Sequence, residues 1–145
     1  NQNVKLMLVG GGELEKEIHK WVDDYGFADY VIFTGIRTDV PRLLQGMDIF
    51  VLPTLYEGFG NVFVEAQAAG LKTIASLEGV PKSTQLTDLI EYVSLKESPE
   101  TWATIILKYK DGYKRESQIE KIREAGFDVK RQAAFLENLY LDAVE

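Results

Sequence analysis

Two carboxylates flank a glycine-containing turn near the middle of the chain. Glu57 precedes the tripeptide Gly58-Phe59-Gly60, and Glu65 follows it. A carboxylate is a poor partner for phosphate but accepts hydrogen bonds well from a pair of neighbouring hydroxyl groups. If a helix begins after the turn, its first N–H groups lack intrahelical partners and can receive phosphate oxygens. These residues therefore fit a ligand with a central phosphate between hydroxylated rings, such as a nucleotide sugar.

The same residues also have a purely structural interpretation. Glu57 would then be a solvated surface residue, and Glu65 would only complement the helix dipole. The glycines would shape a turn and would not make room for a ligand. Residue types and spacing alone leave both interpretations open.

Alternating strands and helices must position this turn. Short apolar runs predict strands at 4–10, 30–35, 47–53, 72–76 and 89–95. Helical spacing of apolar residues predicts helices from residue 13 to Gly26, at 39–46 and at 61–70, the last with Asn61 as N-cap and Gly70 as C-cap. After residue 97 only helical patterns follow, at 98–109, 116–126 and 129–144, and Ser98 is the expected N-cap of the first.

This order predicts an α/β fold: a Rossmann-like, doubly wound parallel sheet with a helical C-terminal tail. The length of 145 residues favours one domain, with an α/β core at about 1–97 and the tail at about 98–145. In such sheets ligands bind beyond the carboxyl ends of the strands. Four segments should reach that edge: Gly10–Gly12, Gly35–Thr38, Pro53–Asn61 and Leu77–Lys82.

Composition excludes several functions. The formal net charge of −7 argues against binding of long nucleic acids, which requires a basic surface. With no cysteine and a single histidine, His19, thiolate and multi-histidine metal sites are excluded, and no D-x-D pair is present to hold a metal-bound diphosphate. No apolar run approaches the roughly 18 residues of a membrane span.

The glycines Gly10–Gly12 raise the possibility of a dinucleotide-binding motif. The third glycine of G-x-G-x-x-G would fall on Glu15, which is too large for the helix–strand contact of that motif. Glu13 also places negative charge at the start of the helix. A tight turn that admits a ligand or a second domain fits better.

The segment Glu57–Ala66, E-G-F-G-N-V-F-V-E-A, resembles the E-x7-E signature of family 4 glycosyltransferases, and the likeness continues through DIFVLPTLYEGFGNVFVEAQAAGLKTIAS. LVGGGELEKEI and VIFTGIRTDVPRLLQGMDIF are similar to the preceding elements of that family's second domain. The resemblance covers roughly residues 3 to 110. Later segments resemble the bacterial branch that assembles capsular polysaccharides and exopolysaccharides.

The resemblance implies a retaining, metal-independent hexosyltransferase with the two-domain GT-B fold, of which this chain is the C-terminal, donor-binding half. Glu65 would bind the ribose hydroxyls, and Glu57 would face the transferred sugar as the catalytic residue, by orientation and electrostatic stabilisation. No protein nucleophile and no cofactor are implied; the donor, most simply a UDP-sugar, is a substrate. The implied substrate-binding residues are Gly58, Phe59, Gly60, Asn61, Val62, Glu65, Gly35, Ile36 and Arg37, the last three near the base.

The chain departs from the family pattern at its start. The family's diphosphate-binding arginine and lysine lie on an earlier βα unit, and this chain begins after that unit and without methionine. The acceptor-binding N-terminal domain has no counterpart, and His19 does not match its histidine. We therefore expect a piece of a longer enzyme that is inactive alone. The parent would act in the cytoplasm, peripherally at the inner face of the cell membrane.

Two alternatives share this scaffold. A nucleotide-sugar epimerase would use the same donor without an acceptor, and a non-catalytic partner subunit would carry an altered donor site. The sequence leaves open which sugar, base and acceptor are used, and which oligomeric state the chain adopts.

Overall fold

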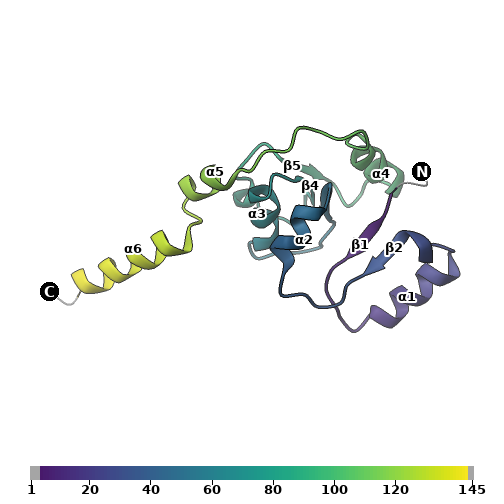
Figure 1. Cartoon of the computed structure of the whole chain (residues 1–145), viewed down its shortest axis with the longest axis horizontal. Helices are drawn as coiled ribbons and strands as arrows, with labels where there is room; N and C mark the ends of the chain where they lie inside the picture. The colour runs from purple at the N-terminus through teal and green to yellow at the C-terminus, as the bar shows by residue number, and fades with distance from the viewer. Residues whose placement is uncertain (1–3, 144–145) are drawn as a thin grey trace. The chain divides into compact units, whose positions relative to one another are not determined.

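In the computed structural model, the described residues 4–143 divide into two units, the first ending at Val40 and the second beginning at Pro41 (Figure 1). This boundary differs from the one indicated near residue 97. The boundary between the two units in the structure follows from tertiary contacts. The boundary near residue 97 marks only the point where the hydrophobic pattern of the sequence becomes entirely helical. That the chain acts as a single nucleotide-sugar-binding domain stays a prediction.

The first unit contains β1 (Leu6–Leu8), α1 (Glu15–Asp24), a short 3-10 turn η1 (Ala28–Tyr30) and β2 (Val31–Phe33). The two strands pair in parallel, with Met7 opposite Ile32. Gly26 ends α1 as predicted, because its φ of +71° leaves the helical region. His19 on α1 stacks on Phe33 of β2, with ring centroids 3.7 Å apart.

The second unit holds the larger sheet. Its elements are α2 (Val40–Gly46), β3 (Ile49–Leu52), α3 (Asn61–Ala68), β4 (Lys72–Ser76), the 3-10 turn η2 (Lys82–Thr84) and β5 (Ile90–Val93). The strands are parallel in the order β3-β4-β5, so β4 is central. Phe63 of α3 is fully buried, and its ring meets Phe50 of β3 edge-on at 5.7 Å. This contact packs α3 on the sheet.

Three helices follow: α4 (Pro99–Leu107), α5 (Ile119–Glu124) and α6 (Val129–Asp142). The prediction that Ser98 caps α4 is confirmed, since its hydroxyl accepts a hydrogen bond from the amide of Thr101 at 3.3 Å. Asp128 caps α6 in the same way, accepting from the amides of Lys130 and Arg131. No described residue of α6 is buried.

Residues 112–118, which we call the strap, connect α4 to α5 across the ends of α2 and α3. The Arg115 guanidinium donates to the carbonyl of Ala69 at 2.8 Å and to three carbonyls at the end of α2, those of Leu44, Gln45 and Met47. Tyr113 donates its hydroxyl to the carbonyl of Asp48 at 2.8 Å. A side chain at Gly70 would lie 2.9 Å from the carbonyl carbon of Glu116. The strap thus satisfies helix-end carbonyls that would otherwise lack partners.

The α/β class, the parallel strands and the helical tail are confirmed. The hydrogen-bonded ladders are β1-β2 in the first unit and β3-β4-β5 in the second, and hydrophobic patterns reveal strand type but not which strands pair. One expectation is wrong. The N-cap of α3 is Gly60, not Asn61, because the chain turns into the helix through a left-handed glycine. Residue 144 of the last predicted helix lies outside the described residues.

Candidate functional site

The loop 53–60 leaves the carboxyl end of β3 and leads into α3. Gly60 stands at the N-cap with φ +77° and ψ 66°, in the left-handed region, and no side chain caps the helix. A Cβ at this position would lie 2.7 Å from the Phe63 ring. Only glycine therefore fits. Because the cap supplies no acceptor side chain, the amides of Asn61 and Val62 are left for another acceptor.

The two carboxylates flank this helix start. Glu57 is half-buried in the loop, and Glu65 is exposed on α3. Neither carboxylate forms a hydrogen bond or ion pair with another residue of the described 4–143 range. Glu65 also lies beyond the first turn of α3, which holds no acidic residue. The structural interpretation of Glu65 as a complement to the helix dipole loses support, since that effect is confined to the first turn.

The loop after β4, residues 77–81, supports the loop after β3. The amide of Glu57 donates to the carbonyl of Gly79 at 2.8 Å, and the Ser76 hydroxyl donates to the carbonyl of Thr54 at 2.5 Å. Gly79 packs so closely that a Cβ would collide with the Thr54 carbonyl oxygen. These contacts fix the backbone on which Glu57 is carried.

Glu78 in turn ties this supporting loop to the end of β5. Its carboxylate accepts hydrogen bonds from the hydroxyl of Ser94 and, at 2.9 Å, from the amide of Leu95. These bonds, that of Ser94 first, lower the pKa of Glu78. Lys82 is the one Lys or Arg residue of the segment Leu77–Lys82. Its ammonium lies over the Tyr92 ring, 3.2 Å from the centroid, in a cation–π contact.

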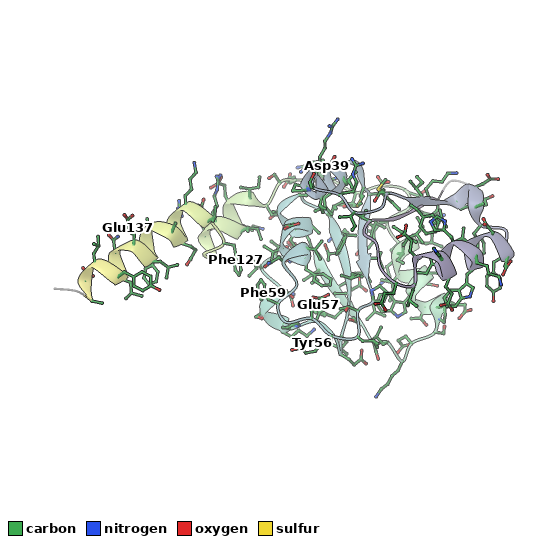
Figure 2. All side chains as sticks on the ribbon, turned by 90° about the horizontal axis from the view of Figure 1, so that it is seen from below. Asp39, Tyr56, Glu57, Phe59, Phe127 and Glu137 are labelled. Atoms are coloured by element: carbon green, nitrogen blue, oxygen red, sulfur yellow. The ribbon has the colours of Figure 1, made fainter. Side chains whose placement is uncertain are left out.

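Phe59 extends from the loop toward the C-terminal helices. Its ring stacks on that of Phe127, with centroids 5.3 Å apart and planes 9° from parallel (Figure 2). Phe127 belongs to the segment between α5 and α6. The sequence gives no sign of this contact.

In the first unit, the segments Gly10–Gly12 and Gly35–Thr38 come together. The amide of Gly10 donates to the carbonyl of Gly35 at 2.9 Å, and a Cβ at Gly11 would lie 3.3 Å from the Ile36 side chain. The glycines thus allow close approach of the two loops at the ends of β1 and β2. The Ile36 side chain is 84% exposed.

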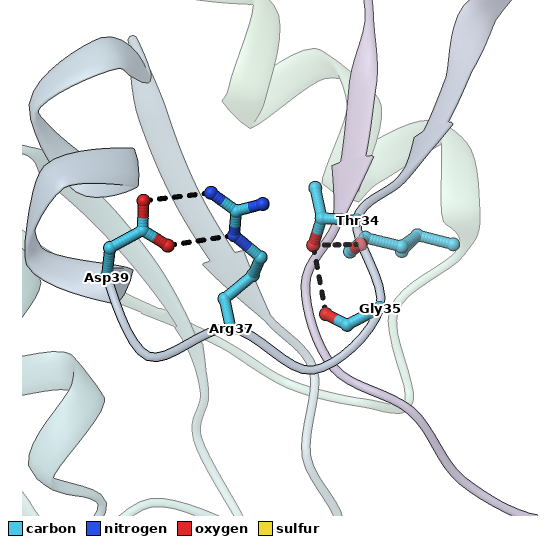
Figure 3. A network of polar contacts seen from close by, with 5 residues as sticks. Thr34, Gly35, Arg37 and Asp39 are labelled. Atoms are coloured by element: carbon cyan, nitrogen blue, oxygen red, sulfur yellow. Dashed lines mark hydrogen bonds and ion pairs between the residues drawn. The ribbon is translucent and has the colours of Figure 1, made fainter.

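Arg37, expected near the base, forms a bidentate ion pair with Asp39 (Figure 3). Nε to Oδ1 and Nη2 to Oδ2 are both 2.8 Å. This hydrogen bonding, and then the charge of Asp39, raises the pKa of Arg37. Nearby in the chain, the Thr34 hydroxyl lies within hydrogen-bond distance of the carbonyl oxygens of Leu8, at 3.2 Å, and Gly35, at 3.1 Å.

The predicted site residues thus fall into two groups. One loop and helix of the second unit bring together Glu57, Gly58, Phe59, Gly60, Asn61, Val62 and Glu65, and one loop of the first unit holds Gly35, Ile36 and Arg37. Each group comes from one short segment of the chain, residues 57–65 and 35–37, and the roles assigned to these residues stay predictions. Residues 4–143 contain no group of three or more His, Asp or Glu side chains suited to a metal ion. Within the same range, no helix combines the length and the apolar composition needed to cross a bilayer.

The sequence patterns did not identify three residues that support the loop 53–60 and α3: Ser76, Gly79 and Gln67. Gln67 is fully buried on α3 and forms hydrogen bonds with Thr84 of η2 and with Thr87 after it. It is the one polar residue among the buried positions of α3, a signal that the sequence does contain. Ser76 and Gly79 carry no comparable signal, because their partners belong to a different loop.

Comparison of the sequence with known proteins identifies the family that this chain matches. The model of the family described as "Glycosyl transferases group 1" matches residues 1–109. EpsF of Bacillus subtilis (strain 168), provisionally named a glycosyltransferase, is 33% identical over 138 residues, which are 94% of this chain and 36% of EpsF. The Vi polysaccharide biosynthesis protein VipC/TviE of Salmonella typhi is 37% identical over 75 residues, 52% of this chain and 13% of that protein.

The solved structure of Anabaena HepE (Alr3699) in complex with UDP-glucose is similar in fold, with a TM-score of 0.63 and 28% identity. The match covers 77% of this chain and 32% of HepE. This chain therefore spans about a third of the length of EpsF and of HepE. Its parallel α/β architecture is that of GT-B glycosyltransferases. Since the family model matches most of the chain, the chain belongs to the glycosyl transferases group 1 family.

Proposed function

We propose that this chain binds the nucleotide-sugar donor of a retaining, metal-independent glycosyltransferase. The observation that carries the proposal is the uncapped start of α3, reached through Gly60, with the carboxylates of Glu57 and Glu65 on either side of it. Neither carboxylate has a partner among residues 4–143, so both keep their full capacity to accept hydrogen bonds from a ligand.

Each group of site residues has the chemistry to bind one part of the donor. The amides between Gly58 and Val62 receive the diphosphate, because they present N–H donors at the positive end of the helix dipole. Glu65 accepts hydrogen bonds from the ribose hydroxyls, and Glu57 accepts them from the transferred sugar. Gly35, Ile36 and Arg37 bind the base. A metal ion and a cofactor have no part in this assignment.

Glu57 acts in the reaction through its charge and its position. Positive charge develops on the sugar as the bond to the diphosphate breaks, and a fixed carboxylate nearby stabilises it. The hydrogen bond between the Glu57 amide and Gly79 keeps this residue from moving with the glycine turn. Glu57 serves as an orienting and stabilising group, and no nucleophile is assigned.

The relatives support the biological role. HepE was solved with UDP-glucose, which favours a UDP-sugar as donor. VipC/TviE takes part in polysaccharide biosynthesis, and another relative, from Escherichia coli, is a galactosyltransferase that acts on a diphosphoundecaprenol-linked sugar. We infer a parent enzyme that extends a bacterial surface polysaccharide or a lipid-linked acceptor, in the cytoplasm at the inner membrane face. Binding of the acceptor falls to the part of such relatives that this chain does not span.

Ligand binding tests the proposal. Saturation-transfer NMR would compare UDP-glucose, UDP-N-acetylglucosamine and GDP-mannose on the wild-type chain, on Glu65→Ala and on Glu137→Ala. Glu137 is an exposed glutamate of α6 far along the chain from the loop and serves as the matched control (Figure 2). We expect Glu65→Ala to weaken binding by about 10-fold or more, the effect of a lost charged hydrogen bond. Equal binding by all three proteins would contradict the donor assignment.

A further inference from the structure

The glycine turn has few restraints of its own. Gly58 has open space around its Cα, and Gly60 adopts the left-handed conformation. Glycine has more conformational freedom to lose on ordering than any other residue. Phe59 lies between these two glycines, and its ring stacks on that of Phe127.

Phe127 is itself held in a well-anchored corner. Its amide donates to the carbonyl of Ile122 at 3.1 Å, and Ile122 is only 5% exposed. The start of α5 is joined to the end of α3, because the amide of Gln118 donates to the carbonyl of Ala68 at 3.2 Å. On the other side of Phe127, Asp128 caps α6 and forms an ion pair with Arg123 at 3.3 Å.

The exposure of Phe127 suggests that its ring does more than fill the core. The residue is 43% exposed and lines an open pocket together with Ala68 and Ile122. Its ring lies nearly parallel to that of Phe59. Such pairs contribute beyond the area that they bury. Phe59 is thereby attached to the end of α5, which is in turn attached to α3.

We propose that Phe127 is a positioning residue of the donor site: its ring holds Phe59, and so presets the backbone amides of residues 58–61. This inference rests on the proposed function, in which those amides receive the donor's diphosphate. A loop that is already ordered loses less conformational entropy when the ligand binds. The segment between α5 and α6 thus contributes to donor affinity without touching the donor.

The first experiment tests the positioning without any ligand. Backbone 15N relaxation would be measured on the wild-type chain and on Phe127→Ala, Phe127→Leu and Phe127→Tyr, with Phe135→Ala as a matched control in exposed α6. We expect order parameters at residues 58–61 to fall from about 0.85 toward 0.6 in the Ala and Leu variants. The Tyr variant keeps the stack and should resemble the wild type. Unchanged order at residues 58–61 in Phe127→Leu would overturn the inference. That variant keeps an apolar side chain at this corner, so its fold is preserved.

The second experiment measures affinity for UDP-glucose in the same proteins. Loss of the stack should weaken binding by about 3- to 10-fold in Phe127→Ala and Phe127→Leu, with recovery in Phe127→Tyr. Equal affinity in the wild type and Phe127→Leu would refute the positioning role while leaving the donor site intact. No binding by the wild type to any nucleotide sugar would refute the proposed function, and the relaxation data would still decide whether Phe127 orders the loop.

Discussion

The side chain of Gln67 makes five hydrogen bonds, and four of them join α3 to η2 and to the chain that follows it. Its Nε2 donates to the carbonyls of Phe63 at 3.0 Å and Thr84 at 2.8 Å. Its Oε1 accepts from the amide of Leu86 at 3.1 Å and from the amide and hydroxyl of Thr87, both at 3.0 Å. The side chain is 0% exposed, so water cannot replace these partners without opening the structure.

Gln67→Leu removes all five bonds at nearly constant volume. Two backbone amides and a hydroxyl then lack acceptors, and each unsatisfied buried group costs about 1–3 kcal/mol. We expect a loss of about 3–9 kcal/mol in the free energy of unfolding. A domain of this size has only about 5–15 kcal/mol in total. Gln67→Leu should therefore populate unfolded molecules at room temperature or lower the thermal midpoint steeply.

Gln67→Glu separates the accepting half of the side chain from the donating half. One carboxylate oxygen can still accept from Leu86 and Thr87, but the other faces the carbonyls of Phe63 and Thr84. Only the protonated acid can donate to one of them, so burial and these carbonyls raise its pKa in the folded state above the ordinary value of about 4.3. The folded state then binds the proton more tightly than the unfolded state. Stability of this variant should be greatest below about pH 4.3 and should fall as pH rises through the raised folded pKa.

Urea unfolding followed by circular dichroism at pH 5 and pH 8 measures both effects. Gln132→Leu is the control, because Gln132 is exposed and makes one side-chain bond, to the carbonyl of Gly126. The reasoning would be refuted by a Gln67→Leu variant within 1 kcal/mol of the wild type, taken as the lower bound for one lost buried partner. It would also be refuted if the stability of Gln67→Glu relative to the wild type did not decline between pH 5 and pH 8.

Two further changes test the loops at the carboxyl ends of β3, β4 and β5. Gly79→Ala places a methyl group against the Thr54 carbonyl and should lower the free energy of unfolding by about 1–3 kcal/mol, as measured by thermal melting. Gly46→Ala is the control, because Gly46 has open space at its Cα and its substitution should change the stability little. Equal melting curves for the two variants would contradict the close packing at Gly79. Glu78 has a pKa lowered in the folded state by Ser94 and Leu95, so its contribution is present above the unfolded pKa of about 4.3 and is lost as pH falls through the lower folded pKa. The stability difference between the wild type and Glu78→Gln should therefore shrink on acidification below about pH 4, and a constant difference would show that the carboxylate makes no such bonds in solution.

Local sequence patterns correctly predicted the helices, strands and caps whose signals lie within the element itself. The strand at 72–76 was predicted with its observed bounds, because a short run with the β-branched residues Thr73 and Ile74 follows the helix-ending Gly70. The cap by Ser98 was predicted because capping joins residues three apart. Asn61 was mistaken for the N-cap because asparagine favours that position, while the backbone angle of Gly60 cannot be read from its name.

Contacts between distant segments were not predictable. The ladder partners of β2 and β3 depend on the whole arrangement of strands, and one sheet and two sheets have the same hydrophobic pattern. The stack of Phe59 on Phe127 could not be predicted either, because nothing in the sequence around one residue marks it as a partner of the other. The candidate carboxylates were identified because the E-x7-E signature is a local pattern of the sequence. The residues that hold that loop in place follow from tertiary structure alone.

The strap also bears on the order in which the chain is made and folds. Arg115 lies 71 positions after Leu44 and 46 positions after Ala69, whose carbonyls it binds. During synthesis the helices α2 and α3 are complete long before their capping guanidinium exists, so these carbonyls must stay hydrated in the growing chain. Contacts over such separations form slowly, since the intervening chain must first be ordered. The second unit should thus reach its final stability only after the strap has been synthesised, and a chain arrested before residue 115 should remain sensitive to proteases.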